Sequence, residues 1–187
     1  MTFKYRLATN ADIEGILQLQ SKYLFANISP AERLQGFVTT PFTISQIEAA
    51  LREKGVFIAE NDDKIVGYAF AASWDFFSQW DIFPYMISRF PEINFHQETL
   101  TDKNTFQYGP VCIDMPYRGL GVFQRLFETM RLHLQKHYPI GITFINQVNE
   151  VSYKAHTKRL GLEVIDRFVY KEKSYYGLAF YTHQSVL

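Results

Sequence analysis

Arg118, Gly119 and Gly121 have the residue types and the spacing that could hold a phosphate group. A helical pattern begins directly after Gly121, and the first N–H groups of a helix have no partner within it and carry partial positive charge. Because glycine has no side chain, a phosphate can approach its backbone closely, and Arg118 adds a positive charge at the edge. Segment 118–123 therefore fits a pyrophosphate cradle, although the same spacing also occurs in turns that bind nothing.

This segment does not match two other phosphate-binding motifs. It has no Gly-Lys-Ser/Thr sequence, which a P-loop requires, and no third glycine near Gln124, which a dinucleotide-binding turn requires. A nucleotide-binding domain that uses this turn is an alternative, but the chain has no repeated strand–helix–strand unit that would support it.

The elements that would position this turn are predicted from hydrophobic periodicity and from turn residues. Helix 121–137 is the clearest, because Val122, Leu126, Met130 and Leu134 lie four residues apart and share one face. The complete predicted order is strand 3–8, a helix from 10, a short helix from 30, a helix from 44, hairpin 56–73, an aromatic segment 74–104, strand 105–114, helix 121–137, strand 140–148, helix 149–161 and hairpin 162–183. This order predicts a single α+β domain over residues 1–187 with one central sheet.

A few residues indicate where these elements begin or bend. Asn10 is expected to cap the first helix, and Thr43 with Gln46 is expected to form a capping box before the third. Pro110 cannot donate a hydrogen bond to a neighbouring strand. Its strand is therefore expected to bulge, or to part from a neighbour, near this position.

The sequence resembles the GNAT N-acetyltransferase family at this loop and along most of its length. The family motif is Q/R-x-x-G-x-G/A between the fourth strand and the third helix, and Pro116, Tyr117, Arg118 and Gly121 stand where the family pattern puts them. Phe123 differs from the family, which has glycine or alanine there. The resemblance implies the GNAT fold, with a mixed central sheet of about seven strands flanked by helices, and it implies acetyl-coenzyme A as the acyl donor.

The resemblance also implies a set of residues that bind acetyl-coenzyme A. Strand 105–114 would offer backbone groups to the pantetheine arm, and its bend at Gly109-Pro110 would open a cleft beside strand 140–148. Helix 149–161 resembles the second cofactor region of the family. The implied cofactor-binding residues are Val111, Cys112, Ile113, Arg118, Gly119, Leu120, Gly121, Val122, Phe123, Asn149 and Ser152.

In GNAT enzymes the acceptor amine attacks the thioester directly, and no acyl-enzyme forms. Many members have a tyrosine in the helix that corresponds to 149–161, where it acts as the general acid. In this sequence His156 and Thr157 occupy the nearest positions, and the spacing to the end of the helix is one residue longer. The catalytic candidates are therefore His156, Tyr153 and Tyr108, each of which could instead only pack in the core.

The aromatic segment 74–104 is where this chain would differ from its relatives. The chain is 17% aromatic, and this segment contains both tryptophans. One interpretation is an apolar pocket for the acceptor, with walls formed by Trp74, Phe77, Trp80, Phe83 and Tyr85. The other interpretation is that these rings pack a helix onto the sheet or form a dimer face.

The composition argues against several classes of protein. The chain has 19 basic and 19 acidic residues, so it lacks the charge expected of a nucleic-acid or membrane-surface binder. Cys112 is the only cysteine, which excludes an intrachain disulfide, and in an apolar strand it is expected to be a core residue and not a nucleophile. His133 and His137 lack a third ligand nearby, so no metal is expected. With no signal peptide or membrane-length apolar run, the expected location is cytoplasmic.

Together these features predict an acetyl-coenzyme-A-dependent acetyltransferase whose acceptor is the primary amine of a small molecule. The alternative is a non-catalytic coenzyme-A-binding sensor or interaction module on the same fold. The missing consensus tyrosine and the presence of Phe123 keep that alternative open. The aromatic segment, or an apolar strand of the C-terminal hairpin, could form the interface of a homodimer.

Overall fold

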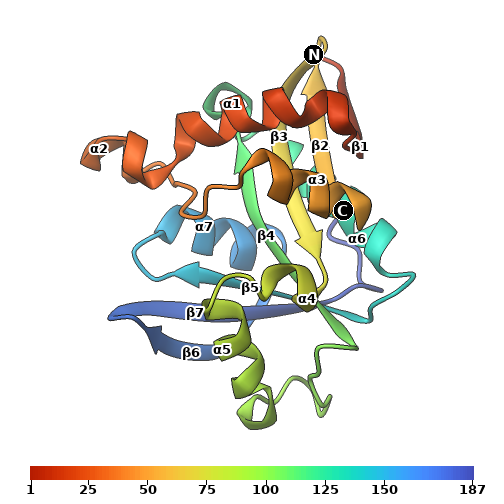
Figure 1. Cartoon of the computed structure of the whole chain (residues 1–187), viewed down its shortest axis with the longest axis vertical. Coiled ribbons are helices and arrows are strands. Elements are labelled where there is room, and N and C mark those ends of the chain that lie inside the picture. The colour runs from red at the N-terminus through yellow and green to blue at the C-terminus, as the bar shows by residue number, and fades with distance from the viewer.

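The computed structural model describes residues 1–187 and contains one seven-stranded sheet with helices on both faces (Figure 1). The strands are β1 (Phe3–Leu7), β2 (Val56–Asn61), β3 (Lys64–Ala72), β4 (Thr105–Ile113), β5 (Ile140–Asn146), β6 (Glu163–Tyr170) and β7 (Lys173–Tyr181). Their order across the sheet is β1-β2-β3-β4-β5-β7-β6, and only β4 and β5 are parallel neighbours. The predicted mixed sheet of about seven strands is confirmed.

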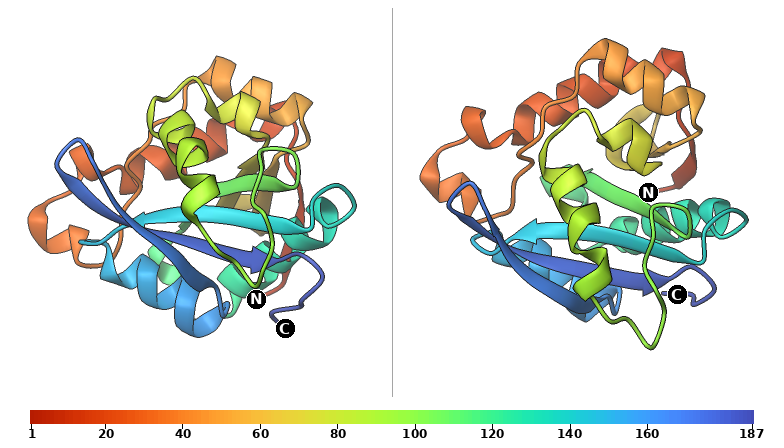
Figure 2. Two further views of the ribbon diagram at one scale, coloured as in Figure 1. Left: turned by 90° about the horizontal axis from the view of Figure 1, so that it is seen from below. Right: turned by 60° about the horizontal axis from the view of Figure 1, so that its bottom comes forward.

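The helices divide into two groups, one on each face of the sheet (Figure 2). The first group comprises α1 (Ile13–Tyr23), α3 (Ile44–Arg52), α4 (Trp74–Phe77) and α5 (Ile82–Arg89), with the short α2 (Pro30–Arg33) beyond the end of α1. The second group comprises α6 (Val122–Leu134) and α7 (Glu150–Lys154). Each group covers a separate buried apolar cluster. No helix is both long enough and apolar enough to cross a membrane.

Local sequence signals account for most of the element boundaries. Thr43 accepts a hydrogen bond from Gln46 N, and the Gln46 side chain accepts one from Thr43 N, so the predicted capping box is confirmed. The prediction that Asn10 caps the first helix is wrong. Thr9 instead caps a 3-10 turn, Asn10–Asp12, that leads into α1, and the Asp12 carboxylate accepts hydrogen bonds from both Thr9 N and Thr9 Oγ1.

The central feature of the fold is the separation of β4 from β5. The two strands pair only where Thr105–Gln107 lie beside Ile140–Ile142, whereas β3 remains paired with β4 as far as Ile113. The separation begins just before Pro110, which has no N–H to donate. The prediction that the strand parts from its neighbour here is confirmed, and it leaves an opening in the middle of the sheet.

The aromatic segment covers the face of the sheet that carries α1 and α3. It folds as α4 and α5 followed by irregular chain to Asn104, as the sequence predicts. Trp74 is buried, and its indole N–H donates a hydrogen bond of 2.8 Å to Thr105 Oγ1 at the start of β4. This contact fixes the start of the segment against β4, and Phe77 and Phe83 of the segment line the opening.

Candidate functional site

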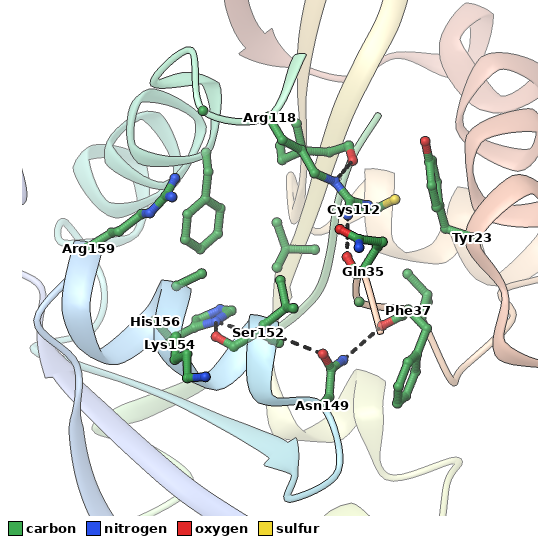
Figure 3. A pocket seen from close by; sticks show the side chains of 18 of the residues that line it. Tyr23, Gln35, Phe37, Cys112, Arg118, Asn149, Ser152, Lys154, His156 and Arg159 are labelled. Carbon is green, nitrogen blue, oxygen red and sulfur yellow. Dashed lines mark hydrogen bonds between the residues drawn. The ribbon is translucent and has the colours of Figure 1, made fainter. Parts of the chain in front are cut away.

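A cavity of about 400 Å³ lies where the end of β4 meets the first turn of α6 and one side of α7 (Figure 3). Val111, Cys112 and Ile113 of β4 form its floor, and the chain between α2 and α3 closes another side through residues 35–38. β5 does not pair with this part of β4. The cavity therefore occupies the opening that the separated strands create.

Arg118 is held in a fixed position at this cavity. Its Nε donates a hydrogen bond of 2.8 Å to the carbonyl oxygen of Ile113, and its Nη1 donates to the carbonyl oxygen of Gln35. Its guanidinium carbon lies 4.9 Å from the centre of the Tyr23 ring, within cation–π distance. Arg118 and Tyr23 form one side of the cavity, opposite Arg159 and His156 (Figure 3).

Gly119 and Gly121 leave open space directly above the start of α6. Their φ angles are 81° and 79°, in the left-handed region that favours glycine. A Cβ atom placed on either residue would meet no other atom within 4 Å. The side chains of Leu120 and Val122 do not line the cavity, since Leu120 is exposed and Val122 is buried in the core. An anion could thus approach the backbone of this turn.

The cavity is strongly cationic. Lys154, Lys158 and Arg159 line it together with Arg118, and no aspartate or glutamate does. Lys154 forms an ion pair of 2.9 Å with Glu150, whereas Lys158 and Arg159 form none. Sequence analysis did not identify these three residues, although three cations within six positions of one helix could have indicated them. Four positive charges around an open glycine turn suit a ligand with several phosphates.

A π-helical turn places these residues along the cavity. The helix that starts at Glu150 continues after Lys154 as a π-helix over Ala155–Arg159, and it ends with Gly161 at a φ of 72°. A π turn contains one more residue than an α turn, and such turns are frequent at functional sites. The extra residue in the spacing of this helix is therefore accommodated here, beside the cavity.

Asn149 and Ser152 lie at the start of the same helix. Asn149 Oδ1 accepts a hydrogen bond of 3.2 Å from Ser152 N, so its predicted role as a helix cap is confirmed. Its Nδ2 donates to the carbonyl oxygen of Phe37, which ties the helix to the opposite wall. Both residues line the cavity, as the proposed contact with a cofactor requires.

His156 is neutral at physiological pH. It is 3% exposed, and burial lowers its pKa to about 4 despite a hydrogen bond to the backbone of Ser152 that favours the charged form. Because a carbonyl oxygen only accepts, Nδ1 must carry the proton that it shares with Ser152 O at 2.7 Å. Nε2 then has the lone pair. His156 is thus better suited to accept a hydrogen bond than to act as a general acid or a general base.

A second and smaller pocket, of about 90 Å³, lies where β4 and β5 separate. It shares six lining residues with the large cavity, and these are Phe37, Val38, Val111, Asn149, Ser152 and His156. Gln107 and Tyr108 line it from β4, and Phe77 and Phe83 line it from the aromatic segment. The two spaces therefore adjoin, with His156 between them.

Tyr108 has an unusual environment in this second pocket. It is fully buried, its hydroxyl has no hydrogen-bond partner, and burial raises its pKa well above the ordinary value. Its ring lies 5.6 Å from that of His156. The hydroxyl stays protonated over the physiological range, so it can donate a hydrogen bond to a group that enters the pocket.

Besides Leu120 and Val122, four residues singled out from the sequence lie outside both spaces. Trp74, Trp80 and Tyr85 pack against other rings, with centroid distances of 5.3 Å to Phe90, 5.1 Å to Phe42 and 5.2 Å to Tyr170 respectively. Tyr153 packs on Tyr176 at 4.4 Å. These residues support the walls of the site from behind, and none of them lines a cavity.

Phe123 and Cys112 line the large cavity without offering reactive groups. The Phe123 ring lies 5.1 Å from the His156 ring, in an edge-on arrangement. Cys112 is 5% exposed, and burial raises the pKa of its thiol to about 12. The thiolate is thus scarcely populated at neutral pH, and the expectation that Cys112 is a core residue is confirmed.

No protein-family model and no curated protein matches this sequence. Solved structures do match it. An N-acetyltransferase from Staphylococcus aureus is 18% identical, with a TM-score of 0.64 over 97% of this chain and 99% of that one. The Salmonella typhimurium protein yncA, solved with acetyl-coenzyme A, is 13% identical, with a TM-score of 0.64 over 97% and 95% of the two chains.

A third similar structure is that of the polyamine N-acetyltransferase of Drosophila melanogaster. It is 12% identical, with a TM-score of 0.65 over 96% of this chain and 100% of that one. At such low identity the likeness establishes the fold, whereas activity and substrate have to be argued from the site. The chain has the fold of the GNAT N-acetyltransferases over nearly its whole length, as its sequence predicts.

Proposed function

We propose that this protein is an N-acetyltransferase that moves an acetyl group from acetyl-coenzyme A to the primary amine of a small molecule. The observation that carries the proposal is the pair of adjoining spaces at the opening between β4 and β5. One is cationic and has an open glycine turn, which suits a phosphate-bearing donor. The other is small and mostly apolar, which suits an acceptor.

The large cavity supplies groups for each part of acetyl-coenzyme A. Arg118 and the backbone N–H groups that follow Gly119 and Gly121 would hold the diphosphate, and Lys158 and Arg159 add further positive charge for phosphates. The free edge of β4 at 111–113 and the start of α7 would hold the pantetheine arm. Acetyl-coenzyme A itself supplies the thioester that makes the acetyl group transferable.

Direct attack by the amine is proposed because no hydroxyl or thiol that lines the two spaces is activated as a nucleophile. Ser152 Oγ lies 3.3 Å from His156 Nδ1, but that nitrogen carries the proton it donates to the Ser152 carbonyl oxygen, so it cannot act as a base for this hydroxyl. Cys112 is the only cysteine, and burial raises the pKa of its thiol to about 12, which keeps it protonated. The hydroxyl of Tyr108 is held protonated in the same way. Binding donor and acceptor side by side then supplies much of the rate increase, since their encounter is already arranged.

Proton handling would involve His156 and Tyr108. Neutral His156 carries a lone pair on Nε2 and borders both spaces, so it can accept a hydrogen bond from the amine and orient it. Tyr108 can donate from its unpartnered hydroxyl to negative charge that develops on oxygen or sulfur. Tyr153 lies outside both spaces and has no direct role in this scheme.

The first test is thermal unfolding of the purified protein with acetyl-coenzyme A, and with ATP and NAD as controls. At ~100 times the dissociation constant, binding should add about 2.7 kcal/mol, which is roughly 5–10 °C for a chain of this size. Arg159→Gln should reduce the shift. Arg52→Gln is the matched control, because Arg52 is also exposed, forms no ion pair and lies outside the cavity. An equal shift with ATP or NAD would contradict the proposed donor.

The second test is turnover with a panel of primary amines, followed by release of the coenzyme A thiol and by mass of the product. The alternative function, a non-catalytic coenzyme-A-binding module, is favoured by two observations. Neither space is lined by a carboxylate, and His156 is too weakly basic to be protonated at neutral pH. Binding of acetyl-coenzyme A without acetylation of any amine would support that alternative.

A further inference from the structure

The smaller pocket has no charged side chain among its lining residues. It is bounded by aromatic rings and by uncharged polar groups, and no aspartate, glutamate, lysine or arginine reaches it. In this respect it is the opposite of the cationic cavity beside it. The inference about its ligand rests on the proposed function, under which this pocket receives the acceptor.

The aromatic rings of this pocket are turned mainly toward one another. Phe77 and Phe83 are buried, with ring centres 4.7 Å apart, and Phe83 meets Phe144 edge to face at 5.5 Å. Phe42 packs on Phe77 and on Trp80 behind it. Cation–π attraction needs an open ring face, and Phe42, Phe77 and Phe83 each already contact another aromatic ring. A second positive charge on the acceptor would therefore lose its water and gain no counter-charge.

Gln107 provides a buried hydrogen-bond acceptor that has no partner in the protein. It is 1% exposed, and its Nε2 donates a hydrogen bond of 2.7 Å to the carbonyl oxygen of Tyr108. That bond fixes the orientation of the amide, because only the nitrogen can donate. Its Oε1 is then buried without a partner, and so is the Tyr108 hydroxyl. Buried polar atoms of this kind normally have partners, so an N–H donor of a bound ligand fits here.

The size of the pocket limits how much of an acceptor can enter. Its volume is about 90 Å³. A dry cavity of ~150 Å³ accommodates one benzene molecule, so this pocket holds a group smaller than a benzene ring. A short aliphatic chain that ends in an amine satisfies this limit.

We infer that the acceptor is a compact primary amine that carries no charge other than that of the reacting amine itself. Its N–H donates to Gln107 Oε1, and its short carbon chain lies against the aromatic wall. Polyamines and amino acids are disfavoured, because each would place a second charge in a pocket without a charged partner.

The test compares three acceptors with the same number of carbon atoms, which are propylamine, 1,3-diaminopropane and 3-aminopropanoate. Each has three carbon atoms, and the far end is a neutral methyl group, a positive ammonium group and a negative carboxylate respectively. With the full-length protein and saturating acetyl-coenzyme A, kcat/KM for propylamine should exceed both others by about tenfold or more, the factor that corresponds to ~1.4 kcal/mol. An equal or higher value for the diamine or for the amino acid would overturn the inference.

A variant should reverse part of this preference. Thr40 lines the pocket, is half-buried and makes no side-chain hydrogen bond, so it tolerates substitution. Thr40→Asp adds a carboxylate and should raise the ratio of kcat/KM for 1,3-diaminopropane over propylamine by about tenfold. Thr40→Asn is the matched neutral control and should leave that ratio unchanged. If both variants behave alike, charge in this pocket does not select the acceptor.

Binding measurements separate failure of this inference from failure of the proposed function. If coenzyme A does not raise the unfolding midpoint, the proposed function fails, and the inference fails with it. If coenzyme A binds but no amine is acetylated, the proposed catalysis fails, whereas the inference about the ligand of the smaller pocket can still be tested by binding. The same three amines are then added to the complex with coenzyme A, and a further rise with propylamine alone supports the inference. The inference is contradicted if the diamine raises the unfolding midpoint, or if none of the three amines raises it.

Discussion

Replacement of Gly121 by alanine tests whether the glycine turn is a ligand cradle or only a turn. The residue has a φ of 79°, and an added Cβ would meet no atom within 4 Å. The cost to the free protein therefore comes from the backbone conformation alone, which is roughly 1–2 kcal/mol for a non-glycine residue. For a chain of this length that corresponds to a fall of about 2–8 °C in the unfolding midpoint.

Gly161→Ala is a closely matched control. Gly161 has a φ of 72° and the same open surroundings, but it does not line the cavity. Both variants should thus lose similar stability. Only Gly121→Ala places a methyl group where a phosphate would approach the start of α6, so only this variant should bind acetyl-coenzyme A weakly.

The assay is titration of each folded variant with acetyl-coenzyme A by calorimetry, below its unfolding transition. Loss of one charge-assisted hydrogen bond is worth about 1.5–3 kcal/mol, so the dissociation constant of Gly121→Ala should rise by roughly 10- to 150-fold. That of Gly161→Ala should stay within about twofold of the parent protein. Equal affinities for the two variants would refute the assignment of this turn to the donor phosphates.

Three further predictions concern buried groups. Because folding lowers the pKa of His156 from its ordinary value of 6.5 to about 4, the unfolded chain binds more protons between these values, so stability should fall as the pH drops through this window. The loss is of the order of 3 kcal/mol, and His156→Gln should remove it in denaturant titrations at several pH values. Tyr108→Phe should leave the free energy of unfolding within about 0.5 kcal/mol of the parent protein, because its hydroxyl has no hydrogen-bond partner to lose. The same variant should lower kcat about 100-fold if that hydroxyl donates a hydrogen bond in the reaction. Cys112→Ala should retain kcat, and loss of turnover in this variant at unchanged stability would contradict direct attack. Alkylation of native Cys112 by iodoacetamide should be slow, because burial raises the pKa of its thiol to about 12.

Features that depend on neighbouring residues were predictable from the sequence. The capping box at Thr43 and Gln46 involves atoms three residues apart, and the Asn149 cap does the same. Burial of one face of α6 follows from helical periodicity. The error at Asn10 has a tertiary cause, since the Asp12 carboxylate that engages Thr9 is also held by Arg6 of β1.

The aromatic segment shows where such reasoning stops. Trp74, Phe77, Trp80 and Phe83 have the same character in the sequence, and all four are wholly or largely removed from water. Only Phe77 and Phe83 face the opening between β4 and β5. Which ring lines a pocket depends on where two strands that are distant in the sequence separate. The hydrophobicity of the residues does not indicate that position.

The cations of the donor cavity were missed for a related reason. Lys154 and Lys158 lie four residues apart, so an α-helical pattern places them on one face. It does not place Arg159 there, and Arg159 reaches the cavity through the π-helical turn Ala155–Arg159. The long spacing to Gly161 indicated an irregularity without revealing its form. The π turn forms in the context of the β4–α6 wall that it faces.

The sequence by itself determined the order of elements, most of their caps and turns, the glycine turn before α6, and the proline near which β4 and β5 separate. Each of these features depends on the chemistry of adjacent residues. Only the tertiary structure decided the protonation state of His156, the unpaired Gln107 oxygen and the contrast between a cationic cavity and an uncharged pocket. These properties arise from desolvation and from the meeting of segments far apart in the chain. Burial and long-range contact are set by the fold as a whole, and no local pattern encodes them.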